Sequence, residues 1–178
     1  MKKIFTIIVL IIAGHCLYAQ TYTAADAGSE VKFSIKNFGL SVAGSFTGLE
    51  GKIIFNPANA ASATFNVSVA TSSVNTGNSS RDKHLKKEDY FDATNHSKLT
   101  FVSSKVGGTA GAYTMEGLLT IKGVSKKISF PFTATPNSVG CIFKGQFKIN
   151  RRDFNVGGSS WVLSDELIVS LNVSAIKQ

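Results

Sequence analysis

Residues 113–134 read YTMEGLLTIKGVSKKISFPFTA, and the two halves of this stretch alternate apolar and polar side chains with a period of two. Tyr113, Met115 and Leu119 share one parity in the first half, and Phe130 and Phe132 share one in the second. Such alternation is typical of half-buried strands. The residues KGVS between the halves are typical of a turn, so this stretch predicts an antiparallel β-hairpin.

The same alternation recurs on both sides of the hairpin. The further segments are residues 31–36, 41–56, 63–69, 99–103, 141–149 and 167–175. Residues 41–56 contain two glycines and read as one long bent strand or as two short ones, which gives eight or nine strands in all. Sequential antiparallel strands in this number close readily into a barrel. The sequence therefore predicts an all-β fold, an eight-stranded antiparallel up-and-down barrel.

One segment, SSRDKHLKKEDYFD at 79–92, breaks the alternation. Ser79 followed by Asp82 has the form of a capping box, and good helix formers come next. We predict one short helix near residues 80–88. A basic helix that ends in Tyr90 and Phe91, set into a chain of strands, suggests a lid or mouth on a β-container.

The first 19 residues have the pattern of a cleaved export signal: two lysines, an apolar run and a small-residue site that ends at Ala19. The apolar run is short for a membrane span. Cys16 leaves a lipoprotein alternative open, in which this cysteine is acylated and not removed. The sequence thus predicts a signal peptide over 1–19, one domain over 20–178, and a periplasmic or secreted protein.

Charge and cysteine content set further limits. The chain carries a formal net charge of +8, and removal of Lys2 and Lys3 with the signal leaves +6. This charge suits anionic lipid surfaces or phosphates, and it equally suits plain solubility. Cys141 would be the one remaining cysteine, so no internal disulfide forms and the core must hold the fold.

Alternation defines two faces of each strand but does not say which face points inward. A water-soluble barrel encloses the phenylalanines, whereas an outer-membrane barrel turns them toward lipid. Several strands are shorter than the roughly 9–11 residues needed to cross a bilayer, and the aromatics do not gather into girdles, so we favour the soluble form. The apolar lining then consists of Phe33, Phe46, Phe65, Phe101, Met115, Leu119, Phe130, Phe132, Phe143 and Phe147.

Glycines on the same parity raise the question of whether this interior is hollow. Gly44, Gly117 and Gly145 share the face of the phenylalanines, and a glycine on an inward face leaves space. The alternative is that these glycines relieve strand curvature while the phenylalanines fill the core. The residues alone leave both readings open.

Catalytic and nucleic-acid functions find little support. His84 and Glu88 have a metal-compatible helical spacing but no third ligand, and no glycine-x-serine-x-glycine motif is present. Cys141 lies on an apolar strand face, where an inert core thiol is expected. The lysines are spread over many strands and form no aromatic-interleaved stripe. We expect no enzyme, no catalytic or metal-binding residue, no cofactor and no nucleic-acid partner.

Nine short motifs occur in a defined order, and this order is more specific than the alternation of apolar and polar residues. They are SEVKFSIK (29–36), VAGSF (42–46), GKIIF (51–55), VNT (74–76), RDKHL (81–85), YFD (90–92), LTF (99–101), GLLTIKGVSK (117–126) and NRRDF (150–154). In these motifs the chain resembles the YceI-like family of exported lipid-binding proteins over nearly all of residues 20–178. The resemblance implies a lipocalin-like barrel that holds a polyisoprenoid chain inside, with the polar head near the mouth. The chain departs from the family at Asn37, where many relatives have histidine, and at Asn155, where relatives often have glycine.

Together with this resemblance, the barrel predicts a soluble carrier or sequestering protein for an isoprenoid lipid, such as an isoprenoid quinone or a polyprenyl phosphate. The residues expected at the head group and mouth are Asn37, Arg81, His84 and Arg151. The arginines have an alternative role, in which they pair with nearby aspartates and fasten the helix to the barrel. A structural or stress-related barrel without cargo is the alternative function. Transient contact with a membrane surface and a homodimer are compatible with the sequence, which does not define the lipid's length, its head group or its delivery partner.

Overall fold

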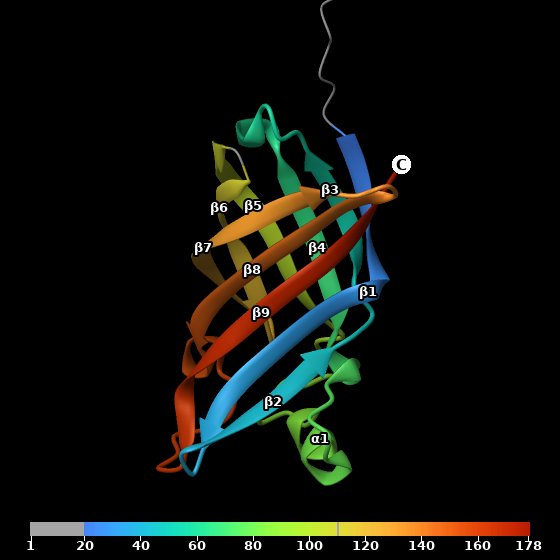
Figure 1. Ribbon diagram of the computed structural model, residues 1–178. Coiled ribbons are helices and arrows are strands. Elements are labelled where there is room, and N and C mark those ends of the chain that lie inside the picture. Colours follow the sequence, from blue (N-terminus) through green and yellow to red (C-terminus); the bar gives the residue numbers. More distant parts are fainter. Residues whose placement is uncertain (1–19, 110) are drawn as a thin grey trace, which may run out of the picture.

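The structure, a computed structural model, describes residues 20–109 and 111–178, so the predicted signal peptide and Cys16 lie outside the described residues. It contains nine strands, one α-helix and three short 3-10 helices (Figure 1). The strands are β1 (Gln20–Asn37), β2 (Leu40–Phe46), β3 (Glu50–Phe55), β4 (Thr64–Ala70), β5 (Lys98–Thr109), β6 (Ala112–Ile121), β7 (Val124–Pro136), β8 (Gly140–Asn150) and β9 (Leu163–Lys177). The helices are α1 (Ser79–Leu85), η1 (Ala60–Ser62), η2 (Thr71–Ser73) and η3 (Arg151–Phe154).

These strands form a closed antiparallel barrel. From β3 to β9 each strand pairs with the next, and β9 pairs with β1 to close the sheet. The long strand β1 pairs with β2 along residues 31–37 and with β3 along residues 20–23, so β2 and β3 together occupy one position. The strand pairing is interrupted between β2 and β3 near Gly48, whose φ is +73°. Eight strand positions result, which confirms the predicted eight-stranded barrel. Of the two alternatives for residues 41–56, the structure has the two short strands and not one long bent strand.

The hairpin at 113–134 is strands β6 and β7. Ile121 pairs with Val124 around a two-residue turn, Lys122–Gly123, in which both residues have positive φ. This turn matches the twist of the strands that it joins. Pro131 lies where β7 pairs with β6 but one residue before its pairing with β8 begins at Phe132. The proline therefore sits at a locally free edge, where its missing N–H is tolerated.

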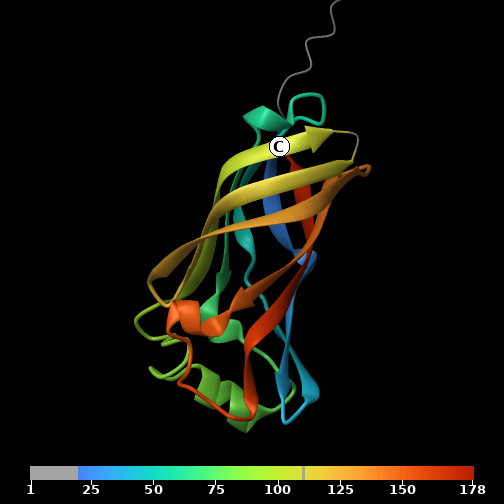
Figure 2. The same cartoon turned by 90° about the vertical axis from the view of Figure 1, so that its left-hand side faces the viewer.

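The predicted helix exists but begins and ends slightly differently. Asn78, not Ser79, is its N-cap, and the Asn78 side chain accepts a hydrogen bond from the Arg81 backbone N–H at 3.0 Å. The Asp82 carboxylate turns back to the preceding loop, where it accepts from the N–H and the hydroxyl of Thr76 at 2.8 and 2.6 Å. The helix ends at Leu85, and turns follow it. Figure 2 shows α1 and η3 at the same end of the barrel.

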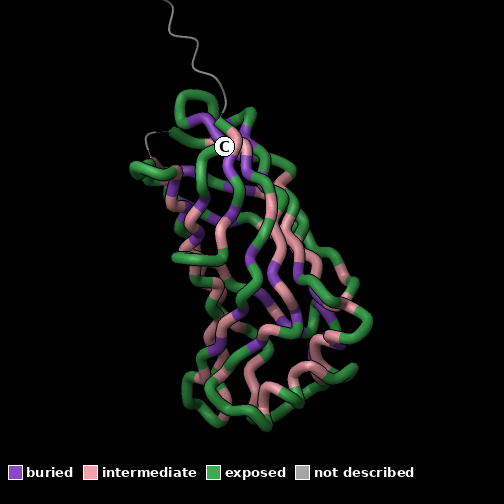
Figure 3. Tube along the Cα trace, turned by 90° about the vertical axis from the view of Figure 1, so that its right-hand side faces the viewer, coloured by how far each residue is buried: buried purple, intermediate pink, exposed green. Residues whose placement is uncertain are grey.

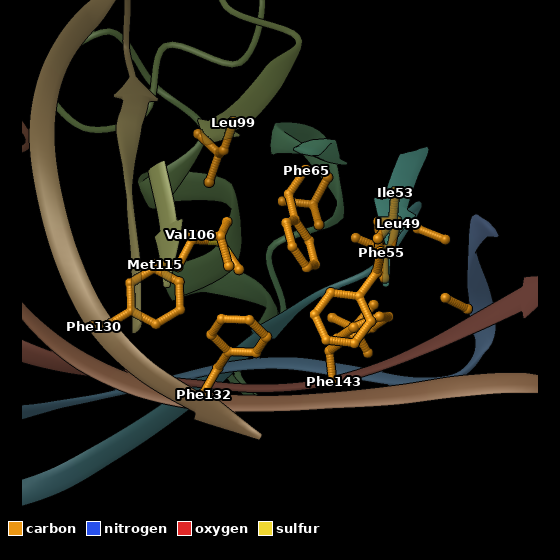
Figure 4. Packing of buried hydrophobic residues seen from close by; sticks show 14 of the residues in the cluster. Leu49, Ile53, Phe55, Phe65, Leu99, Val106, Met115, Phe130, Phe132 and Phe143 are labelled. Atoms are coloured by element: carbon orange, nitrogen blue, oxygen red, sulfur yellow. The ribbon is translucent and has the colours of Figure 1, made fainter. Parts of the chain in front are cut away.

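The core is concentrated at the other end, near residue 20 and the C-terminus. Six aromatic side chains, here called the aromatic cluster, fill this end: Tyr22, Phe55, Phe65, Tyr113, Phe132 and Phe143. Several of their rings meet edge to face, with Phe55 and Phe65 each 5.2–5.3 Å from a neighbouring ring centroid (Figure 4). Such contacts add to the large apolar area that each ring buries. Along the strands, buried positions alternate with more exposed ones (Figure 3).

Candidate functional site

The other half of the barrel is hollow. It encloses a cavity of about 630 Å³ between the aromatic cluster and the end that carries α1. This volume lies within the roughly 300–1,000 Å³ typical of small-molecule pockets. The walls are mainly apolar and come from all strands except β3 and from the segment that contains α1. The barrel is therefore divided into a packed half and a half that could accept a ligand.

Two groups of aromatic rings face this cavity. Phe101, Phe130 and Phe147 form one group, with centroids 5.7 and 4.6 Å apart along the series. In the second group Phe46 lies 5.7 Å from Phe33 and 5.4 Å from Phe91. Phe91 follows α1 in the chain, so this second group joins the barrel wall to the helical segment.

Three glycines allow some of these rings to lie close to the wall. A Cβ added at Gly44 would lie 2.6 Å from Cε1 of Phe33, and one at Gly117 would lie 2.7 Å from Cε2 of Phe101. At Gly145 an added Cβ would come within 3.1 Å of the Phe130 ring. The sequence left open whether these glycines leave empty space or relieve strand curvature. In the structure, rings from adjacent strands lie over them, and the hollow is the space that remains in front of the rings.

Ten residues were predicted to form the apolar lining, and the structure divides them. Those that line the cavity are Phe33, Phe46, Phe101, Leu119, Phe130 and Phe147. The other four, Phe65, Met115, Phe132 and Phe143, point inward but are buried in the packed half and do not line the cavity. All ten obey the predicted parity. Parity indicates which face is inside, whereas position along the barrel axis decides between packed core and cavity.

The sequence prediction missed a large aliphatic part of the wall. Strand β9 contributes Leu167, Val169, Leu171 and Val173, and other strands contribute residues such as Val67, Val69, Ile121 and Ile149. The same alternation identifies these positions, but the prediction was restricted almost entirely to phenylalanines. Tyr90, Phe91 and Phe154 also line the cavity and come from outside the strands.

The four residues predicted for the mouth, Asn37, Arg81, His84 and Arg151, all border the cavity. Asn37 ends β1, at the turn to β2. His84 is exposed on α1, and its ring centroid lies 4.8 Å from that of Tyr90. These side chains come from three separated parts of the chain and lie at the same end of the barrel.

Arg151 is buried, with 4% of its surface exposed, and protein acceptors surround its guanidinium group. Nε donates to the Ser164 carbonyl at 3.0 Å, and Nη1 donates to the carbonyls of Val156 and Gly158, both at 2.9 Å. Nη2 pairs with the Asp165 carboxylate at 2.6 Å and approaches the Leu163 carbonyl at 3.5 Å. The arginine thus fastens the loop between β8 and β9. Its acidic partner is Asp165, and not one of the aspartates near the helix.

Arg81 is held differently. Its Nε donates to the Thr76 hydroxyl at 2.7 Å, and its Nη2 donates to the Thr76 carbonyl at 2.9 Å. The Thr76 hydroxyl also donates to the Asp82 carboxylate, so Thr76 links α1 to the loop that precedes it. The Asp89 carbonyl accepts a hydrogen bond of 2.8 Å from the Gly157 N–H, which links the helical segment to the β8–β9 loop across the mouth.

Asn155 explains one departure from the family pattern. It has φ +55° and ψ +34°, the left-handed conformation, at the end of η3. Glycine adopts this conformation freely, and asparagine is among the few other residues that do so at modest cost. Asn155 therefore supports the left-handed backbone that ends η3.

Cys141 lies in the packed half, with 1% of its surface exposed. Burial raises the pKa of its thiol to about 11, so the thiol is protonated at neutral pH. This agrees with the inert core thiol expected from the sequence. Within residues 20–109 and 111–178, no three His, Cys, Asp or Glu side chains gather in a way that would hold a metal ion. No helix in that part of the chain is long and apolar enough to cross a membrane.

Comparison with known proteins agrees with this architecture. The model of the YceI-like domain matches residues 22–175. Protein YceI of Shigella flexneri is 30% identical over 159 residues, covering 83% of this chain and 81% of that protein. The UPF0312 protein YE1254 of Yersinia enterocolitica is 30% identical over 154 residues, covering 83% of this chain and 80% of that protein.

Solved structures share the fold. BcnA of Burkholderia cenocepacia superposes with a TM-score of 0.79 at 28% identity, covering 84% of this chain and 98% of that one. A polyisoprenoid binding domain from Saccharophagus degradans superposes with a TM-score of 0.70 at 16% identity, covering 90% of this chain and 100% of that domain. Since the family model spans most of the sequence, the chain belongs to the family of YceI-like domains.

Proposed function

We propose that this protein binds an isoprenoid lipid in its half-barrel cavity and carries, stores or sequesters it. The observation that carries the proposal is the cavity itself, a mainly apolar hollow of about 630 Å³ that Asn37, Arg81, His84 and Arg151 border at the end that carries α1. If each non-hydrogen atom takes the roughly 30 Å³ that a water molecule occupies in the liquid, the cavity holds about twenty such atoms. That is the size of about four isoprene units, and a longer chain would extend out through the mouth.

Apolar burial alone would supply the affinity. Each buried methylene contributes about 0.8 kcal/mol, so a chain of a few isoprene units needs no catalyst and no covalent link. The Saccharophagus degradans domain, named for polyisoprenoid binding, supports the proposal at the level of the shared fold. Binding, and not catalysis, is therefore the activity we propose.

The rim of the mouth suggests how the lipid would enter. Phe38, Leu40 and Trp161 are 75%, 73% and fully exposed, and Val162 beside them is 39% exposed. The Phe38 N–H donates to the Val162 carbonyl at 2.8 Å, so the two loops form one apolar rim, and Phe38 and Val162 also border the cavity. Phe38 has φ +50°, a conformation that rarely carries a bulky side chain. In the proposed function, an exported protein touches a membrane with this rim while it exchanges lipid.

Gentle purification followed by organic extraction and mass spectrometry tests the proposal. We expect an isoprenoid to co-purify, and delipidated protein to bind a geranylgeranyl lipid. Leu119→Glu places a charge in the cavity and should abolish retention. The neighbouring Leu118 is half exposed on the outer wall, so Leu118→Glu is the matched control and should bind normally. Lipid-free protein that takes up no isoprenoid would overturn the carrier proposal and favour a structural module without cargo.

A further inference from the structure

All charged side chains that border the cavity are basic. They are Lys32, Arg81 and Arg151, accompanied by His84, and among the described residues no aspartate or glutamate lines the cavity. An apolar cavity whose only charged groups are cationic favours a ligand with a negative charge, because a buried anion needs a counterion. The question is which of these cations is free to bind one.

Two of them already have carboxylate partners. Lys32 Nζ lies 2.8 Å from the Glu30 carboxylate, and Arg151 Nη2 lies 2.6 Å from that of Asp165. The hydrogen bonds of Arg151 to carbonyls and to Asp165 occupy its Nε and both terminal nitrogens. Guanidinium has five N–H donors, and the fifth of Arg151 is directed at the Leu163 carbonyl at 3.5 Å, so none is left for a ligand. Arg151 therefore stabilises the backbone at the mouth and does not bind a head group.

Arg81 is different. Among the described residues it has no carboxylate within 4.0 Å, and its hydrogen bonds to Thr76 use only Nε and Nη2. Its Nη1 donors remain, on a side chain whose orientation Thr76 fixes at the cavity's edge. Asp82 lies next in sequence, but its carboxylate is directed at Thr76. His84 follows Arg81 by three residues, which places both on one face of α1.

We propose that Arg81, assisted by His84, binds a phosphate head group, so that the ligand is an isoprenoid phosphate and not a neutral quinone. This inference rests on the proposed function and specifies its ligand class. A guanidinium fork matches phosphate oxygens in geometry and charge. A quinone carbonyl carries no charge and would leave the Arg81 cation without a counterion at the edge of an apolar cavity.

Three probes with one tail separate the head groups: geranylgeranyl phosphate, geranylgeraniol and a menaquinone with a geranylgeranyl chain. Titration into delipidated protein should give phosphate binding about tenfold or more tighter than binding of the alcohol, since a hydrogen bond to a charged group is worth about 1.5–3 kcal/mol. Raising the salt concentration should weaken binding of the phosphate but not of the alcohol.

Arg81→Gln removes the proposed partner, and Lys83→Gln is the matched control. Lys83 is exposed on the same helix, and it does not border the cavity. Arg81→Gln should lose the preference for phosphate while its affinity for geranylgeraniol stays within about twofold, which shows that the cavity is intact. Lys83→Gln should keep the preference.

Three results would overturn the inference. They are equal binding of phosphate and alcohol by the unaltered protein, tighter binding of the quinone, and a phosphate preference that survives Arg81→Gln. In each of these cases the tail still binds and the proposed function stands. If none of the three probes binds, the proposed function fails together with the inference.

Discussion

Replacing Gly44 by alanine should narrow the cavity without replacing any of the side chains that line it. Gly44 pairs directly with Phe33 across β1 and β2, and the Phe33 ring lies over it. An added Cβ would lie 2.6 Å from Cε1 of the ring and closer still to Cζ, whereas ordinary contact begins at 3.4 Å. The ring must therefore withdraw by at least 0.8 Å, the difference between these distances. Because strand β2 lies behind the Phe33 ring, the ring moves into the cavity.

The expected loss of affinity follows from the space that the ring takes. If the shift excludes one or two methylene groups of the bound tail, at about 0.8 kcal/mol each, binding weakens by about four- to fifteenfold. Titration with prenyl alcohols of increasing length measures this loss. The best-bound chain should also become shorter, because the cavity has less room.

Two further variants isolate the cause. Gly107→Ala is the matched control, since an added Cβ there meets nothing within 4 Å and Gly107 does not border the cavity. In a Phe33→Ala background, Gly44→Ala should have little additional effect, because no ring remains to be displaced. Undiminished binding by Gly44→Ala, or an equal loss with and without Phe33, would refute the reasoning.

Other consequences concern the loop, the rim and the packed half. Arg151→Met should lower the free energy of unfolding by about 3 kcal/mol, because it strips buried carbonyls and Asp165 of their donor; a urea midpoint close to that of the unaltered protein would contradict the role given to Arg151. Trp161 is the only tryptophan in the sequence, so its emission should shift to the blue when vesicles are added if the rim enters a membrane, and an unchanged spectrum at saturating lipid would exclude such contact. In the protein without residues 1–19, the Cys141 thiol, with a pKa of about 11, should resist maleimide at pH 8 until urea unfolds the chain. Rapid labelling of native protein would show that the thiol is accessible. Because the folded-state pKa of Cys141 is raised above the usual value, the stability that this thiol contributes is present below about pH 9 and is lost as the pH rises toward 11.

The sequence predicts the strands well because alternation is a local property. Phe65 and Phe101 both occupy inward positions, and both are found inside the barrel. Whether each meets packed core or cavity depends on its height along the barrel, which the registers of β4, β5 and their neighbours set together. No pattern within one strand contains that information. For this reason the prediction identified the interior and not its division.

The mouth was harder to predict for a different reason. Arg151 and Arg81 look alike in the sequence, since each is followed by an aspartate within two residues. Their roles diverge because backbone carbonyls of the β8–β9 loop and of the start of β9 surround Arg151, whereas Thr76 holds Arg81. Carbonyl directions depend on how loops fold over the barrel. Residue types alone therefore identify both cations but not the one that is free.

The division of the barrel gives each half a separate task. Rings such as Phe55 and Phe143 are almost fully buried by protein, and removing one such side chain typically costs about 3–5 kcal/mol. Phe33, Phe101 and Phe147 are only partly buried, because they face the cavity. The packed half therefore stabilises the fold whether or not a ligand is present. The hollow half has apolar surface that becomes fully buried only when a ligand binds. A carrier needs both conditions, since it must remain folded when empty and still gain free energy when it is filled.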